Sequence, residues 1–219
     1  MNRPRQPADP QVRRRFLTVA LATLGAALMI GSYFLPWWQF HLKAPQYPQG
    51  LVLLVSLTGI TGDVGEIDII NHYIGMSHLS EGAAFERAWG GWLLGVLVVL
   101  IVASTLLAGR QIGWIAGAIG LSLPVGFIAD TQYWLWKFGH DLDPKAPVHI
   151  APFTPTMFGE GKVGQFVTTA TPSLGFALAV AGVALVGLAV WQRSKVCRVC
   201  PASESCTLAC PVALVGVRP

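Results

Sequence analysis

Charged residues are scarce in this sequence. Asp, Glu, Lys and Arg together make up 12% of the 219 residues, whereas hydrophobic residues make up 53%. An average soluble domain carries roughly 25% charged residues. The mean hydropathy of +0.55 agrees with this shortage of charge. The composition therefore excludes an average soluble domain and predicts a membrane protein.

Cysteine is absent from the sequence before Cys197. The long polar segments upstream therefore contain neither a thiol nucleophile nor a disulfide framework. The sequence also lacks a Gly-x-Ser-x-Gly elbow, a His-Glu-x-x-His helix and a phosphate-binding loop. These absences remove the usual sequence signs of a hydrolase or an NTPase, and we predict that the protein is not an enzyme.

Long apolar runs, in contrast, are abundant. A helix needs about 20 residues to cross a hydrocarbon core of about 30 Å, and backbone groups in lipid must bond within their own segment. We therefore predict an all-α membrane protein with four transmembrane helices, at about residues 16–38, 89–108, 112–129 and 174–191. Pro124 is expected to kink the third helix. Tryptophans near the helix ends are expected in the lipid headgroup layer, namely Trp37, Trp38, Trp89, Trp92, Trp134, Trp136 and Trp191.

Basic residues concentrate in the segments that flank these helices on one side. The N-terminal segment 1–15, Arg110 and the tail 193–219 are basic, whereas segments 39–88 and 130–172 hold more acidic than basic residues. The positive-inside rule therefore predicts a multi-pass protein of the bacterial inner membrane with both termini in the cytoplasm. Because this topology explains the net charge of +4, a nucleic-acid partner is not expected.

The two outer segments, 39–88 and 130–172, are too long to be simple turns. Connections longer than about 12–15 residues are usually functional or disordered, and these two contain aromatic and β-branched residues. Residues 51–57 (LVLLVSL) are typical of a short strand, and residues 63–76 of a short helix. The second segment is rich in proline and is expected to be extended and to pack on the first. We predict one small extracytoplasmic cap of short β and helical structure.

The sequence GEIDIINHYIGMSH in the first outer segment contains candidate metal ligands. Helical spacing would place Asp68, His72 and Met76 on one face, at i, i+4 and i+8. Imidazole and thioether groups suit copper, the thioether favouring Cu(I). A neighbouring carboxylate such as Asp68 could orient an imidazole without binding the metal itself, and His78 could supply a further ligand.

A structural interpretation of the same sequence is also open. Ile67, Ile70 and Ile74 form an apolar stripe, in which case His72 is a hydrogen-bonded residue at the boundary of the cap and Met76 belongs to the core. Asp130 either marks a proton or ion pathway or is a solvated helix end. The remaining histidines are expected at the interface or the surface, namely His41, His140 and His149.

Four cysteines follow the last apolar run. Cys197, Cys200, Cys206 and Cys210 could close a tetrahedral zinc site or hold an iron–sulfur cluster. The alternative is a flexible tail with free or palmitoylated thiols. Disulfides are not expected, because the cytoplasm keeps thiols reduced.

Several strings between about residues 16 and 190 occur together, namely PWW at 36–38, APQYPQGL at 44–51, GDV at 62–64, EID at 66–68, NHYIGM at 71–76, GHDLDP at 139–144 and PFTP at 152–155. In these strings the chain resembles a family of poorly characterised bacterial inner-membrane proteins, whose genes are often found beside those for copper handling and nitrous oxide reductase maturation. The resemblance implies an accessory role in assembling, or supplying copper to, an extracytoplasmic copper enzyme of denitrification.

The sequence thus favours a membrane helper protein that binds copper, or a periplasmic copper protein, through its outer segments. Two alternatives stay open. The first is a redox subunit with a zinc or iron–sulfur site at the four cysteines. The second is a structural subunit of a respiratory complex, in which the outer segments dock partner subunits and bind no metal.

Overall fold

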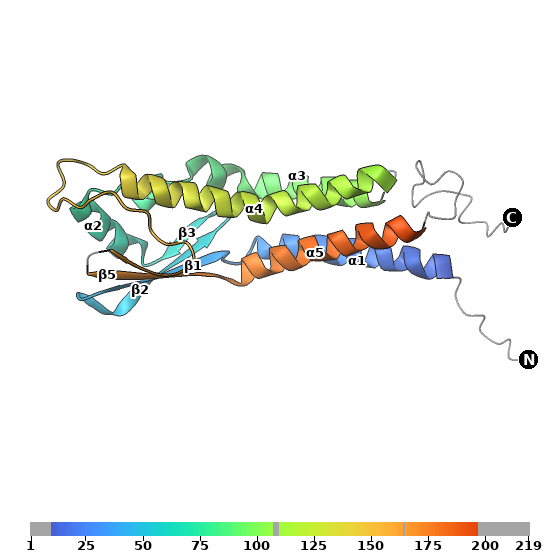
Figure 1. The fold of residues 1–219 in the computed structure, drawn as a ribbon, viewed down its shortest axis with the longest axis horizontal. Coiled ribbons are helices and arrows are strands. Elements are labelled where there is room, and N and C mark those ends of the chain that lie inside the picture. Colours follow the sequence, from blue (N-terminus) through green and yellow to red (C-terminus); the bar gives the residue numbers. More distant parts are fainter. Residues whose placement is uncertain (1–9, 107–109, 164, 197–219) are drawn as a thin grey trace, which may run out of the picture. The chain divides into compact units, whose positions relative to one another are not determined.

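The computed structural model describes residues 10–106, 110–163 and 165–196. These residues form five α-helices, five strands and one short 3-10 helix (Figure 1). The helices are α1 (Pro10–Ser32), α2 (Val64–Ile74), α3 (Ala84–Leu106), α4 (Arg110–His140) and α5 (Leu174–Val196), with the 3-10 helix η1 at Leu79–Glu81. The strands are β1 (Trp38–Ala44), β2 (Tyr47–Ser56), β3 (Gly59–Gly62), β4 (Gly159–Val163) and β5 (Phe166–Pro172). The four cysteines of the tail, Cys197, Cys200, Cys206 and Cys210, lie outside the described residues.

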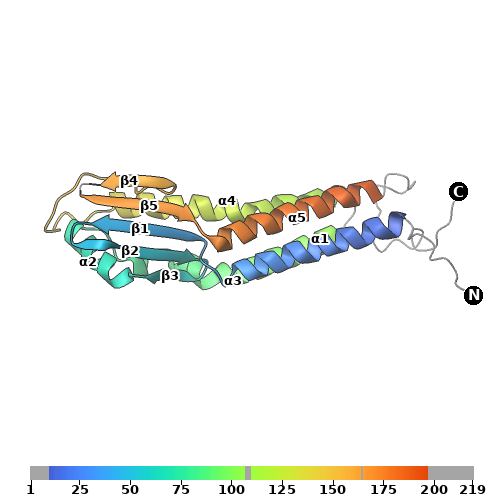
Figure 2. The same ribbon diagram turned by 90° about the horizontal axis from the view of Figure 1, so that it is seen from below.

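The prediction of an all-α protein is wrong. The outer segments form a five-stranded antiparallel sheet in the order β3-β2-β1-β5-β4 (Figure 2). Only β2 was expected from the sequence. The central strand β1 pairs on one side with β2, its neighbour in the chain, and on the other with β5, where Trp38 lies opposite Pro172. The second outer segment therefore supplies two strands rather than an extended loop alone.

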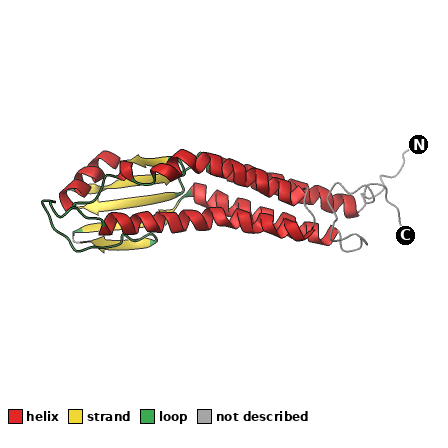
Figure 3. Cartoon of the chain, turned by 90° about the horizontal axis from the view of Figure 1, so that it is seen from above, coloured by secondary structure: helices red, strands yellow, loops and turns green. Residues whose placement is uncertain are grey.

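The sheet has one covered face and one open face because side chains alternate along each strand. Trp38 and Phe40 of β1 and Leu53 of β2 are buried in one apolar core together with Ile67 of α2 and Ala170 of β5. Phe127 and Leu135 of α4 pack against the same core. Figure 3 shows the strands gathered into this single sheet. The intervening residues of β1, Gln39, His41 and Lys43, lie on the opposite, open face.

Two adjacent tryptophans anchor the core at the start of the sheet. The side chains of Trp37 and Trp38 are completely buried. The Trp37 indole N–H donates to the Ser32 carbonyl (2.9 Å), and the Trp38 indole N–H donates to the Met157 carbonyl (2.9 Å). Phe127 packs on Trp37 with ring centroids 4.9 Å apart. The expectation that these two tryptophans lie in the headgroup layer is therefore wrong, since they fill the core instead.

Two helices of the described chain, and not four, are long and apolar enough to cross a membrane. Their apolar stretches, called apolar windows below, are Ala84–Ser104 in α3, with a mean hydropathy of 1.8, and Leu174–Arg193 in α5, with a mean hydropathy of 2.3. The apolar part of α1, Phe16–Ser32, is shorter. Helix α4 runs unbroken through Pro124 and carries Asp130 and several polar residues. Helices do occupy all four apolar runs, but the prediction of four transmembrane helices is wrong.

The described chain divides into two compact units. One contains the sheet and α2 within residues 30–94 and 123–179, and the described part of the other is helical, with residues 10–29, 95–106, 110–122 and 180–196. In the helical unit α1 and α5 approach closely at glycines, because a Cβ atom on Gly182 would lie 2.8 Å from the Gly25 carbonyl oxygen. Arg193 of α5 donates to the Ser104 carbonyl of α3 (2.9 Å).

Candidate functional site

The start of α2 is fixed to the sheet by a pair of hydrogen bonds. The Asp63 amide donates to the Val52 carbonyl (2.9 Å), and the Asp63 carboxylate accepts from the Val52 amide (2.7 Å). Ile67, one turn further along, is buried in the core of the sheet. The helix that carries Asp68 and His72 is thus attached to β2.

Helix α2 ends earlier than the sequence suggested. Gly75 adopts the left-handed conformation (φ 80°), and the Met76 amide donates to the Asn71 carbonyl (2.8 Å), as expected of a helix C-terminus closed by glycine. Met76 therefore lies beyond the helix and does not extend the face of Asp68 and His72. The predicted i, i+4, i+8 arrangement is wrong, because the chain turns at Gly75.

The turn at Gly75 instead brings His78 to Asp68. One Asp68 oxygen accepts from the Leu79 amide (2.8 Å), and the other lies 3.6 Å from Nδ1 of His78. The Asp68 side chain is 16% exposed and the His78 side chain 52% exposed. With Nδ1 directed at the carboxylate, Nε2 is the His78 nitrogen left to meet a ligand. At 3.6 Å this approach is longer than a hydrogen bond, and the orienting role expected of Asp68 stays a prediction.

His72 lies exposed on α2 with its ring edge-on to Tyr73, at 6.4 Å between ring centroids. The buried polar residue of this helix is Asn71, its neighbour. Across the described residues, no three His, Cys, Asp or Glu side chains gather in a group that could hold a metal. The pair of Asp68 and His78 is the part of the candidate site that the structure assembles.

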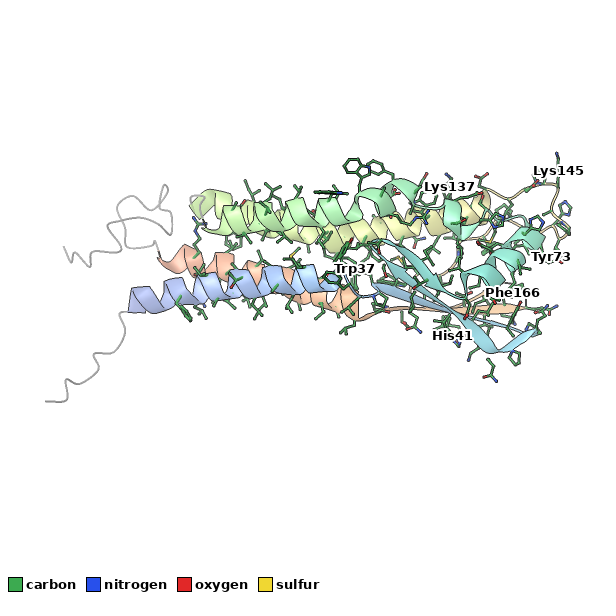
Figure 4. The ribbon with its side chains drawn as sticks, turned by 180° about the vertical axis from the view of Figure 1, so that it is seen from behind. Trp37, His41, Tyr73, Lys137, Lys145 and Phe166 are labelled. Atoms are coloured by element: carbon green, nitrogen blue, oxygen red, sulfur yellow. The ribbon has the colours of Figure 1, made fainter. Side chains whose placement is uncertain are left out.

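The second outer segment packs on the end of α2, as expected. The Asp143 amide donates to the Gly75 carbonyl (2.8 Å), and the Val148 amide donates to the Tyr73 carbonyl (3.0 Å). A Cβ atom on Gly75 would lie 2.9 Å from that of Ala146. Figure 4 shows Tyr73 and Lys145 at the same end of this unit.

The other three histidines do not join the pair. His140 stacks on Trp136 of its own helix, and its Nδ1 lies 2.9 Å from the Trp136 carbonyl oxygen. His149 contacts the Pro144 carbonyl within its own loop (3.0 Å). His41 lies on the open face of the sheet, opposite Val52 and Thr169, rather than at a helix end (Figure 4).

A second polar group lies where α4 meets the start of α3. Burial raises the pKa of the Asp130 carboxyl, the nearby Glu86 carboxylate raises it further, and the Trp134 indole N–H acts in the opposite direction. Lys137 lies 4.9 Å from the Trp134 ring centroid. Asp130 is on α4, outside the two apolar windows, so the raised pKa reflects its protein surroundings.

We expect Asp130→Asn to stabilise the protein at neutral pH but not in acid. Because the folded-state pKa lies above the ordinary value, the folded state holds more protons between those two pKa values, and stability falls as pH rises through that window. The free energy of unfolding of the parent protein and the variant, measured in mixed micelles at several pH values, would test this prediction. Asp141→Asn, an exposed carboxylate further along the chain, is the control. An equal effect of the two variants at every pH would contradict the prediction.

No protein-family model matches this sequence, and no curated protein matches it either. The resemblance in the strings around NHYIGM therefore stays a prediction.

Proposed function

We propose that this chain is an accessory protein of the bacterial inner membrane that is anchored by α3 and α5. Its sheet-containing unit would lie outside the cytoplasm and present copper, or a docking surface, to an extracytoplasmic copper enzyme of the nitrous oxide reductase type. The protein would act as a helper and not as a catalyst.

The exposed apolar surface of α3 supports the membrane anchor. Only 17% of its apolar window is buried within the protein, and the figure for α5 is 39%. The core helix of a soluble protein would be largely buried. Trp92, Val96 and Val99 of α3 all lie more than half exposed. Lipid is the medium in which such a surface is stable.

The distribution of charge supports the orientation. Arg193 and Lys195 lie at the end of α5. The positive-inside rule would place this end of α5 in the cytoplasm. The sheet-containing unit, in which acidic residues outnumber basic ones, would then lie outside.

The contact between Asp68 and His78 is the observation that carries the copper hypothesis. A carboxylate that holds one ring nitrogen fixes the orientation of an imidazole and raises its basicity at the other nitrogen. Met76, two residues earlier, is half-buried, and His72 is exposed on the same short segment. Imidazole and thioether donors suit Cu(I). These residues fit a transferable copper ion, held by His78 with His72 or Met76, better than a closed structural metal centre.

Copper binding by the outer residues is tested best in protein whose tail cysteines cannot bind copper. In full-length protein with Cys197, Cys200, Cys206 and Cys210 replaced by serine, we expect Cu(I) to be held in competition with a chromogenic chelator. Asp68→Asn is expected to weaken binding by about 10–100-fold, and His78→Ala by at least as much, since Asp68 acts through His78.

His140→Ala is the matched control, because His140 is an exposed histidine that stacks on Trp136 of its own helix and lies 2.9 Å from the Trp136 carbonyl oxygen. It should bind copper as tightly as the parent protein. Absence of Cu(I) binding in the cysteine-free protein, or an equal loss in His78→Ala and His140→Ala, would contradict the copper proposal. The redox alternative rests on the four cysteines, and iron or zinc lost with those cysteines would favour it.

A docking subunit without metal is the second candidate. Ile69 and Tyr73 lie exposed on α2, and Val148, whose amide bonds to the Tyr73 carbonyl, is exposed beside them. An apolar surface of this kind on an otherwise acidic unit suits contact with another protein. Co-purification of a respiratory complex that survives His78→Ala but is lost in Tyr73→Glu would favour this function over copper binding.

A further inference from the structure

We propose that the lipid headgroup layer meets this protein at a belt of five exposed apolar side chains. We name these residues, Phe34, Trp89, Trp92, Phe158 and Leu174, the headgroup belt. The proposal rests on the proposed membrane anchor and adds the depth at which the protein sits. It assigns lipid, rather than another protein, as the partner of this surface.

The members of the belt are large and exposed. Phe34 is 77% exposed, Trp92 74% and Leu174 61%, while Trp89 and Phe158 are each just over half exposed. Aromatic rings, and the indole of tryptophan above all, favour the boundary between hydrocarbon and water. Trp37 and Trp38, which the sequence alone assigned to that boundary, are buried and cannot face lipid.

Contacts inside the sheet-containing unit show that residues of the belt from different helices lie near one another. A Cβ atom on Gly91 would lie 3.0 Å from the Tyr33 hydroxyl, so α3 touches the chain beside Phe34 at the position next to Trp92. A Cβ atom on Gly175, next to Leu174, would lie 2.7 Å from the Leu35 carbonyl oxygen. The start of α5, the end of α1 and the start of α3 therefore meet where the belt residues project.

Phe158 joins the same level through the buried tryptophans. Its ring packs edge-on against Trp38 at 4.9 Å between centroids, while Trp37 contacts Phe176 of α5 at 5.9 Å. The belt thus lies around the end of the sheet at which β1 begins. Strand β1 then runs away from this level toward Ala44.

Polarity changes along α3 at the belt. One turn before Trp89 lie Glu86 and Arg87, and Arg87 donates to the Ala83 carbonyl. After Trp92 the exposed side chains are apolar, including Leu93, Val96 and Val99. On α5 no charged residue occurs from Leu174 to Trp191, a helical length of about 27 Å, close to the thickness of a hydrocarbon core. Both helices therefore enter lipid at the belt.

Spin labels on α3 test the proposal in the full-length chain. Single cysteines would replace Phe85, Trp89, Trp92, Val96 and Val99 in turn, with the four native cysteines changed to serine. The protein is reconstituted in vesicles of phosphatidylethanolamine and phosphatidylglycerol. Collision rates with oxygen, which concentrates in lipid, and with a water-soluble nickel chelate are then measured. All five positions are exposed or lie at the surface, so the label displaces no core residue.

We expect the nickel chelate to dominate at Phe85→Cys and oxygen to dominate at Val96→Cys and Val99→Cys, with the ratio reversing between Trp89 and Trp92. Phe34→Cys and Leu174→Cys should fall at the reversal. Thr61→Cys, on strand β3 of the outer sheet, is the aqueous control. Oxygen dominance at Val96 and Val99 with a reversal elsewhere would overturn the belt but leave the anchor intact. Nickel dominance throughout would overturn both, and low collision rates with both reagents would show that a protein partner covers this surface.

Discussion

Replacing Trp38 with alanine is expected to lower the free energy of unfolding by about 3–5 kcal/mol, the usual range for removing a large aromatic ring from a core. Trp38 is completely buried, and its ring contacts Phe127, Phe158 and Phe176. Its indole N–H is bonded to the Met157 carbonyl, 119 residues further along the chain. The substitution would therefore open a cavity and detach the segment that leads into β4.

Trp38→Phe separates the contribution of ring packing from that of the indole hydrogen bond. The phenyl ring keeps most of the packing but leaves the Met157 carbonyl without its donor, at an expected cost of about 1–3 kcal/mol. Unfolding in mixed micelles, followed by tryptophan fluorescence, would compare the variants. Trp136→Phe, at an exposed and stacked ring, is the control and should change stability little. Equal effects of Trp38→Ala and Trp136→Phe would show that the core is not organised around Trp38.

Gly182→Ala is expected to destabilise the helical unit by about 1–3 kcal/mol, as overpacking of a closely packed contact does. The new methyl group would lie 2.7 Å from Cγ of Met29 and 2.8 Å from the Gly25 carbonyl oxygen. Since the second of these atoms is backbone, α1 and α5 would have to separate. Small residues at such a contact let two helices approach closely and gain packing energy that larger residues prevent.

Gly187→Ala provides the matched control on the same helix. No atom lies within 4 Å of a Cβ atom placed there. Alanine also favours a helix over glycine by about 1 kcal/mol, so we expect a neutral or slightly stabilising effect. Opposite signs for the two variants in the same micelle titration would support the close contact of α1 and α5. Destabilisation of similar size at both positions would contradict it.

The helices could be predicted from the sequence because their signal is local. Runs of apolar residues near 89–108 and 174–191 mark α3 and α5 without any knowledge of the rest of the chain. The strand at 51–57 and the helix at 63–76 were likewise found close to β2 and α2, with errors at their ends. Gly75 was visible in the sequence, and its usual role as a helix terminator could have placed the end of α2.

Strands β1 and β5 were missed because they pair with each other although they lie far apart in sequence. Strands β3 and β4 were also missed, and these short edge strands pair with their chain neighbours β2 and β5. Trp38 pairs with Pro172 and His41 pairs with Thr169, and no local sequence pattern predicts pairs between residues so far apart in the chain. The threonines of β5 give only a weak alternation, and the prolines of its segment suggested a loop instead. The sheet forms because β1 offers apolar side chains on one face, which the two outer segments must cover together.

For the candidate metal ligands, too, the sequence predicted some features and the tertiary structure decided others. Their residue types and their nearness in sequence were evident, whereas their contacts depended on the turn after Ile74. The left-handed Gly75 takes Met76 off the helix and returns His78 to Asp68. A spacing argument that assumes a continuous helix cannot give this result.

The sequence by itself determined that this is a chain poor in charge, with apolar helices, basic ends and histidine-bearing polar segments between them, since composition and local periodicity do not depend on the fold. Only the tertiary structure decided that those segments form a sheet, that Trp37 and Trp38 are buried while Trp92 is exposed, and that His78 lies beside Asp68. Each of these depends on residues distant in sequence or on a single turn of the backbone, and burial is a property of the packed chain rather than of a residue type.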